Sequence, residues 1–141
     1  MNRDPWQPQL TGPGEIQMFW RRLVRPLGRR QDMLYVVLVD ADDRPIPILN
    51  EIEHPPPLLE GEAAQGFGSV IRQTIDDLLP GGRVALLYHR PGHGVTDADR
   101  ETAASYYAVL EAFGIPHETI YLATESRISA LPRPGDEPMT A

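Results

Sequence analysis

Two short apolar runs constrain the fold of this chain more than any other feature. Residues 33–39 read MLYVVLV, and residues 84–88 read VALLY. A strand with one face in water alternates apolar and polar residues, whereas a continuously apolar, β-branched run is typical of a strand buried on both faces. The sequence therefore predicts strands at the centre of a sheet that other elements cover.

Further segments around these runs have the patterns of strands or helices. We expect a strand at 46–52, a helix at 62–79, a helix from Thr96 to about Phe113 and a strand at 120–123. Pro47 places the first of these strands at a sheet edge, because proline has no N–H to donate to a ladder. The order strand, strand, helix, strand, helix, strand predicts an α/β fold in which a mixed sheet is sandwiched with two main helices.

The two ends of the chain differ in composition from this centre. Residues 1–14 and 132–141 are rich in Pro and Gly and are predicted to be disordered tails. Residues 15–30 are predicted to contain a short basic amphipathic helix, and residues 31–131 to form a single α/β domain. The apolar stripe of the helix would cover part of the core or bind a partner chain. Its members are Ile16, Phe19, Trp20, Leu23 and Val24.

Composition excludes several classes of protein. The 141 residues correspond to one ordinary domain, and the chain has no cysteine. Structural disulfides, thiolate metal sites and a cysteine nucleophile are therefore excluded. The N-terminal sequence MNRDPWQPQL lacks the apolar core of a signal peptide, and no apolar stretch approaches the roughly 18 residues of a membrane span. We expect a soluble, cytoplasmic protein with no membrane partner.

Charge is unevenly distributed along the chain. The net charge of -7 argues against a general polyanion binder, because phosphate binding needs clustered cations. All 13 basic residues are arginine, and five of them lie within ten residues: Arg21, Arg22, Arg25, Arg29 and Arg30. We interpret this cluster as a solvated arm that packs on an acidic domain. Contact with nucleic acid or with a partner protein through these arginines is the alternative.

The segment YHRPGHGVTDAD, residues 88–99, is dense in potential metal ligands. His89, His93 and Asp99 could coordinate a zinc ion, which commonly takes histidine and carboxylate ligands. Alternate residues of a strand share a face, however, so Tyr88 and Arg90 should point to one side and His89 to the other. Neither tyrosine nor arginine is a usual zinc ligand.

Three stretches of the chain, taken in their order along the sequence, resemble the JAB/MPN metalloprotease family in its bacterial RadC-like form. YVVLVDADDRPI resembles the first strand of the family, VALLYHRPGHGVTDAD its metal-bearing loop, and VLEAFGIPHETIYL its last helix and strand. The resemblance spans residues 34–122 and implies a JAB/MPN-like, cytidine-deaminase-like architecture. In the family, two histidines of an H-x-H motif and a downstream aspartate bind zinc, and an earlier glutamate serves as general base.

The chain departs from the family at these functional positions. The first histidine falls on Tyr88 and the second on Arg90, while the aspartate falls on Asp99, or on Glu101 if the loop is not shortened. The candidates for the glutamate are Glu51, Glu53 and Glu62. Too few ligands remain for a zinc-water hydrolase, and the fixed charge of Arg90 would repel a cation.

A specific hypothesis follows from these departures. We expect an Arg90–Asp99 ion pair to fill the former metal pocket, with Tyr88 packed beside it. The alternative is an exposed Arg90 and an Asp99 that only caps its helix. The resemblance then implies a non-catalytic interaction or scaffold domain without a cofactor, with a protein partner or a second copy in a homodimer. A divergent zinc hydrolase using His89, His93 and Asp99 remains an alternative function, as does nucleic-acid binding through the N-terminal arginines.

Overall fold

A computed structural model describes residues 9–23 and 32–135 of the chain. Five strands form one mixed sheet in the order β2-β1-β3-β4-β5. Their bounds are β1 (Met33–Val39), β2 (Asn50–Glu53), β3 (Arg83–His89), β4 (Ile120–Ala123) and β5 (Ile128–Leu131). β1 is antiparallel to both β2 and β3, β3 is parallel to β4, and β4 is antiparallel to β5. The two apolar runs therefore form neighbouring strands at the centre of the sheet, as predicted.

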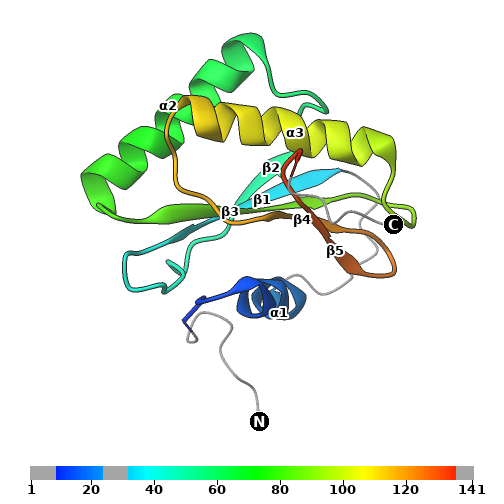
Figure 1. The fold of residues 1–141 in the computed structure, drawn as a ribbon, viewed down its shortest axis with the longest axis horizontal. Coiled ribbons are helices and arrows are strands. Elements are labelled where there is room, and N and C mark those ends of the chain that lie inside the picture. Colours follow the sequence, from blue (N-terminus) through cyan, green and yellow to red (C-terminus); the bar gives the residue numbers. More distant parts are fainter. Residues whose placement is uncertain (1–8, 24–31, 136–141) are drawn as a thin grey trace.

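Helices cover both faces of this sheet. α2 (Gly61–Leu78) and α3 (Asp97–Ala112) lie over one face, and α1 (Pro13–Leu23) lies under the other (Figure 1). The α/β class predicted from the order of elements is confirmed. None of the helices in the described ranges is long and apolar enough to span a bilayer.

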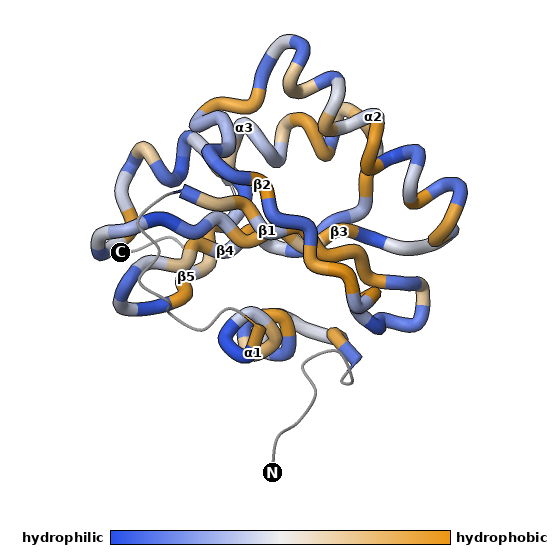
Figure 2. Tube along the Cα trace, turned by 180° about the vertical axis from the view of Figure 1, so that it is seen from behind, coloured by the Kyte–Doolittle hydropathy of each residue, from blue (hydrophilic) through white to orange (hydrophobic). Residues whose placement is uncertain are grey.

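Alternating side chains divide the core into two layers. Leu34 and Val36 of β1 pack on the side of α2 and α3, whereas Met33, Tyr35 and Val37 pack on the side of α1. This division is the period-2 geometry of a strand with both faces buried. Apolar residues are accordingly concentrated along β1 and β3, between the helical layers (Figure 2).

Two predictions about strands are wrong. The strand predicted at 46–52 begins only at Asn50. The segment before Asn50 makes only isolated contacts with β1. These are a β-bridge between Pro45 and Val39 and a hydrogen bond from Ile46 N to Leu38 O of 2.8 Å. Pro47 cannot extend that ladder. The second error is the omission of β5, whose four residues ISAL lack a strong β pattern and form a strand by pairing with β4.

The N-terminal boundary also differs from the prediction. α1 begins at Pro13, and Leu10 is buried, with its N–H donating to Asp43 O at 2.6 Å. Proline suits the first position of a helix, where its missing N–H would have no partner. The tail predicted for residues 1–14 is therefore too long at its C-terminal end. Residues 24–30, which the prediction placed in the same helix, lie outside the described ranges.

Candidate functional site

The end of β3 directs its side chains to opposite sides, as strand alternation predicted. Tyr88 belongs to the core layer beneath α2 and α3. The next residue, His89, lies on the other face, where its ring meets the edge of Tyr35 at a centroid distance of 6.4 Å. Arg90, one residue beyond the strand, again points toward α3 and contacts Asp99. Tyr88 and Arg90 therefore share a side from which His89 is excluded.

Arg90 and Asp99 form the ion pair that the sequence predicted. Nε of Arg90 donates to Oδ1 of Asp99 at 2.7 Å, and Nη2 donates to Oδ2 at 2.5 Å. The guanidinium also donates to the carbonyls of Pro91 at 2.9 Å and Gly94 at 2.6 Å, which fixes the loop between β3 and α3. The side chains are 17% and 6% exposed, so the pair is largely withdrawn from water. The alternative of an exposed arginine is wrong.

Asp99 also closes the N-terminus of α3. Its Oδ2 accepts from the backbone N of Thr96 at 2.8 Å, and its own N–H donates to the Thr96 hydroxyl at 3.2 Å, which is a capping box. Burial alone would raise the pKa of the Asp99 carboxyl, but the hydrogen bonds from Arg90 and Thr96 outweigh it and hold that pKa below its usual value. The same contact raises the pKa of Arg90. Both groups are therefore charged at neutral pH.

Tyr88 contacts a different carboxylate from the one in this pair. Its hydroxyl donates to Oδ2 of Asp32 at 2.8 Å, and Asp32 precedes β1, whose Leu34 is the cross-strand neighbour of Tyr88. Burial and the neighbouring Asp32 raise the pKa of the Tyr88 hydroxyl, so it stays protonated as a donor. The side of β3 that would carry an H-x-H pair thus holds one phenol and one guanidinium.

The alternative zinc ligands are not brought together. His89 lies across the sheet from Asp99, and Nε2 of the exposed His93 lies 3.2 Å from Oε2 of Glu125. Within residues 9–23 and 32–135, no group of three or more His, Asp or Glu is arranged to hold a metal ion. The residues on the Asp99 side, a phenol and a cationic guanidinium, do not fit zinc either.

The remaining candidate residues are dispersed. Glu51 and Glu53 lie on β2, with β1 between them and β3, while Glu62 lies in the first turn of α2 and Glu101 is exposed on α3. Arg21 and Arg22 are exposed on α1. Arg25, Arg29 and Arg30 fall outside the described residues, so the structure describes only part of the arginine cluster.

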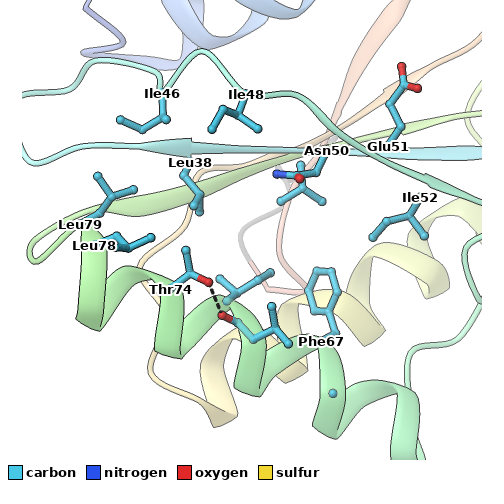
Figure 3. A pocket seen from close by; sticks show the side chains of 14 residues that line it. Leu38, Ile46, Ile48, Asn50, Glu51, Ile52, Phe67, Thr74, Leu78 and Leu79 are labelled. Carbon is cyan, nitrogen blue, oxygen red and sulfur yellow. Dashed lines mark hydrogen bonds between the residues drawn. The ribbon is translucent and has the colours of Figure 1, made fainter.

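An apolar groove lies between α2 and the β1–β2 side of the sheet. Its volume is about 670 Å³. Figure 3 shows Ile52 of β2 and Phe67 of α2 on opposite sides of it, while the carboxylate of Glu51 points away from α2. Four of the six large hydrophobic residues that are exposed in the described ranges line this groove: Ile48 at 61%, Ile52 at 37%, Val70 at 65% and Leu78 at 73%. Exposed apolar residues that line one groove are typical of surfaces that bind a ligand or another protein.

The sequence did not identify this groove. In the sequence, Val70, Ile71, Ile75 and Leu78 fall on one apolar face of α2, a pattern that favours burial of all four. In the structure, Ile71 and Ile75 are buried, but Val70 and Leu78 are not covered by the sheet. The one available signal was the width of the stripe, which exceeds what a helix at a sheet edge can bury.

Comparisons with known proteins supply no family for this chain. No family model matches it, and no curated protein matches it. The Arg90–Asp99 pair and the groove are therefore the two features of the structure that bear on function.

Proposed function

We propose that this chain is a non-catalytic interaction domain of the JAB/MPN type, RadC-like, that binds an extended segment of a partner protein. The observation that carries the proposal is the apolar groove beside the edge strand β2. The family assignment is supported by the order of elements and by the placement of Tyr88, Arg90 and Asp99 around the end of β3.

The charge at the end of β3 disfavours metal-dependent catalysis. Arg90 places a fixed positive charge on the side of β3 where the family resemblance puts a zinc ligand, and Asp99 already neutralises that charge through two hydrogen bonds. A cation entering this position would have to displace the guanidinium from a nearly buried carboxylate, which is unfavourable. The side chains at this strand end therefore stabilise the loop between β3 and α3 and hold no reactive group.

The groove and β2 together define what the partner segment is like. β2 lies at one edge of the sheet, and no strand in the described ranges pairs with its outer side. Asn50 and Ile52 are paired with Val36 and Leu34, so they face α2, whereas Glu51 and Glu53 face the opposite side. An added strand would place alternate side chains in the groove and the others near the glutamates. The partner segment is therefore an extended stretch that alternates apolar and basic residues.

A second copy of this chain fits the same edge poorly. Residues that lie opposite each other in a paired sheet share a face, so two β2 strands related by a two-fold axis would place Glu51 and Glu53 of one copy against the same residues of the other. Like charges directly opposite each other destabilise a strand pair. A basic partner removes this repulsion, and for that reason we favour a different protein over a homodimer.

A synthetic peptide tests this docking mode. An octapeptide that alternates isoleucine and arginine should bind with a Kd on the order of 10 μM, and a scrambled peptide of the same composition should bind at least about tenfold more weakly. Leu78→Gln and Val70→Gln should each weaken binding about tenfold, because they place an amide in an apolar contact. Fluorescence anisotropy at several salt concentrations measures these affinities.

Leu58→Gln is the matched control, because Leu58 is 47% exposed but does not line the groove. Its affinity for the peptide should equal that of the natural chain. Equal binding of the alternating and scrambled peptides would show that charge alone drives association and would contradict the proposal. A dimer that is detected by light scattering and abolished by Leu78→Gln would also contradict the proposal, because a second copy of the chain would then occupy the groove.

Restoring the missing histidines tests the family assignment. In the double variant Tyr88→His/Arg90→His, the two new imidazoles lie on the side of β3 that faces Asp99. We expect this variant to bind about one equivalent of zinc, since two histidines and a carboxylate are a common zinc set. Metal analysis and calorimetric titration with zinc measure the gain.

Adding Asp99→Asn to the double variant should weaken zinc binding at least about tenfold, because a neutral amide replaces the third ligand. If the double variant folds but takes up no zinc, the resemblance to the family is contradicted. Stoichiometric zinc bound to the natural chain at the loop between β3 and α3 would contradict the non-catalytic assignment instead.

A further inference from the structure

A second, smaller pocket lies on the α1 side of the sheet. Its volume is about 230 Å³, and its polar lining comes from three places: Arg21 of α1, His89 at the end of β3, and Thr124, Ser126 and Arg127 of the turn between β4 and β5. It is smaller than the roughly 300 Å³ at which pockets for drug-sized ligands begin. The pocket lies at the carboxyl ends of the parallel pair β3 and β4, where His89 is the cross-strand neighbour of Ala123. This end of parallel strands is where α/β proteins bind their ligands.

The two arginines of this pocket differ from most of the other arginines in the described ranges. Arg72, Arg83, Arg90, Arg100 and Arg133 each form an ion pair with a carboxylate. Neither Arg21 nor Arg127 forms one with any residue in the described ranges. The chain has 20 acidic residues against 13 basic ones, so carboxylates are abundant. Two arginines that form no ion pair within the described ranges therefore lie beside the same pocket, which makes the pocket attractive to an anion.

Local structure holds these groups in place. The turn is closed by a hydrogen bond from Thr124 N to Arg127 O of 2.9 Å, and the hydroxyl oxygens of Thr124 and Ser126 lie 3.4 Å apart. Gln17 of α1 donates to the carbonyl of Ile128 at 3.0 Å, which ties the helix to the first residue of β5. Arg21 follows Gln17 by one helical turn and so projects from the same face of α1 toward the turn.

We propose that this pocket binds a phosphate group. Guanidinium groups match phosphate oxygens in shape and charge, and the hydroxyl groups of Thr124 and Ser126 add neutral donors. No carboxylate of residues 9–23 or 32–135 lines the pocket, and Glu125, the one acid of the turn, contacts His93 instead. The volume admits a phosphate and a few further atoms, so the group belongs to a free ion or to a small phosphate ester. The site uses no residue of the groove and does not depend on the function proposed above.

Calorimetric titration at constant ionic strength tests this site. The full chain should bind inorganic phosphate with a Kd on the order of 1 mM, while chloride at the same ionic strength produces no binding heat. The double variant Arg21→Gln/Arg127→Gln should bind at least about tenfold more weakly, because both charge-assisted contacts are lost. Ser126→Ala, which removes one hydroxyl group from an exposed turn, should bind about threefold more weakly. Glycerol 3-phosphate distinguishes the two sources, since it binds more tightly than the free ion only if the pocket accepts an ester.

Arg44→Gln is the control for loss of charge, because Arg44 is also exposed and forms no ion pair in the described ranges, yet does not line the pocket. This variant should bind phosphate as the natural chain does. Circular dichroism verifies that each variant is folded. The proposal is overturned if the natural chain binds no phosphate, or if the arginine double variant and the natural chain bind it equally well.

Discussion

Replacing Trp20 by alanine is expected to lower the free energy of unfolding by about 4 kcal/mol. Trp20 is 0% exposed and packs with Phe19, at a ring-centroid distance of 5.2 Å, in the core layer between α1 and the sheet. Removal of the indole would leave a large cavity that the surrounding strands cannot fill. Urea denaturation monitored by circular dichroism measures the loss.

Two further substitutions test whether the loss of stability in Trp20→Ala comes from the loss of buried packing. Trp20→Phe should cost only about 1 kcal/mol, because it keeps an aromatic ring and removes a buried indole N–H that has no hydrogen-bond partner in the described ranges. Met18→Ala, on the same helix, should change stability by less than about 0.5 kcal/mol, because Met18 is 50% exposed. A small effect of Trp20→Ala would mean that α1 is a detachable arm and not part of the core.

The centre of the fold could be predicted because its signals are local. The runs that form β1 and β3 are apolar at every position, and this pattern requires cover on both faces wherever the strands lie. Thr96 marked the start of α3 for a similar reason, since a cap is a contact between residues three positions apart. Both signals are independent of the rest of the chain.

The edges of the sheet could not be predicted in the same way. β5 forms a strand because its backbone can pair with that of β4. β2 is short because Pro47 delays regular pairing with β1. Whether Val70 and Leu78 are covered depends on how far the sheet extends beneath α2, and that extent is fixed by the short β2. The groove is therefore a consequence of tertiary structure.

The candidate site was predictable in part. Alternation along β3 and the position of Asp99 in the first turn of α3 were sufficient to predict the Arg90–Asp99 pair. The bond from Tyr88 to Asp32 was not predicted, because it depends on the register that pairs Leu34 with Tyr88. The register between β1 and β3 leaves no local trace, because β1 and the VALLY run within β3 are apolar at every position.

Replacing Asp99 by alanine is expected to lower the free energy of unfolding by about 3 kcal/mol, the effect of breaking a buried ion pair by removing one partner. The substitution would leave the guanidinium of Arg90 without its carboxylate and the N-terminus of α3 without its capping box. Asp97→Ala is the matched control. Its side chain lies in the same helical turn but is 97% exposed, and within the described ranges it forms an ion pair with Arg100, so its loss should be within about 0.5 kcal/mol.

A double-mutant cycle separates the ion pair from the helix cap. Asn at position 99 can still accept the Thr96 N–H, and Met at position 90 keeps the apolar stem of the arginine. Asp99→Asn, Arg90→Met and the combined variant should therefore show a coupling of about 2 kcal/mol, with the combined variant more stable than the two single losses predict. Additive losses would mean that the two charges stabilise the fold independently of each other.

The pH dependence of stability gives a further test of the same pair. The pKa of Asp99 is lower in the folded chain than in the unfolded chain, where it should be about 3.9. A depressed pKa stabilises the folded state above the unfolded value, and this contribution is lost as the pH falls through the folded value. The natural chain should therefore lose stability more steeply than Asp99→Asn below about pH 4, whereas the two curves should run parallel above about pH 5. Parallel curves across the whole range would contradict an ionised, hydrogen-bonded Asp99 as the group that holds the β3–α3 loop to α3.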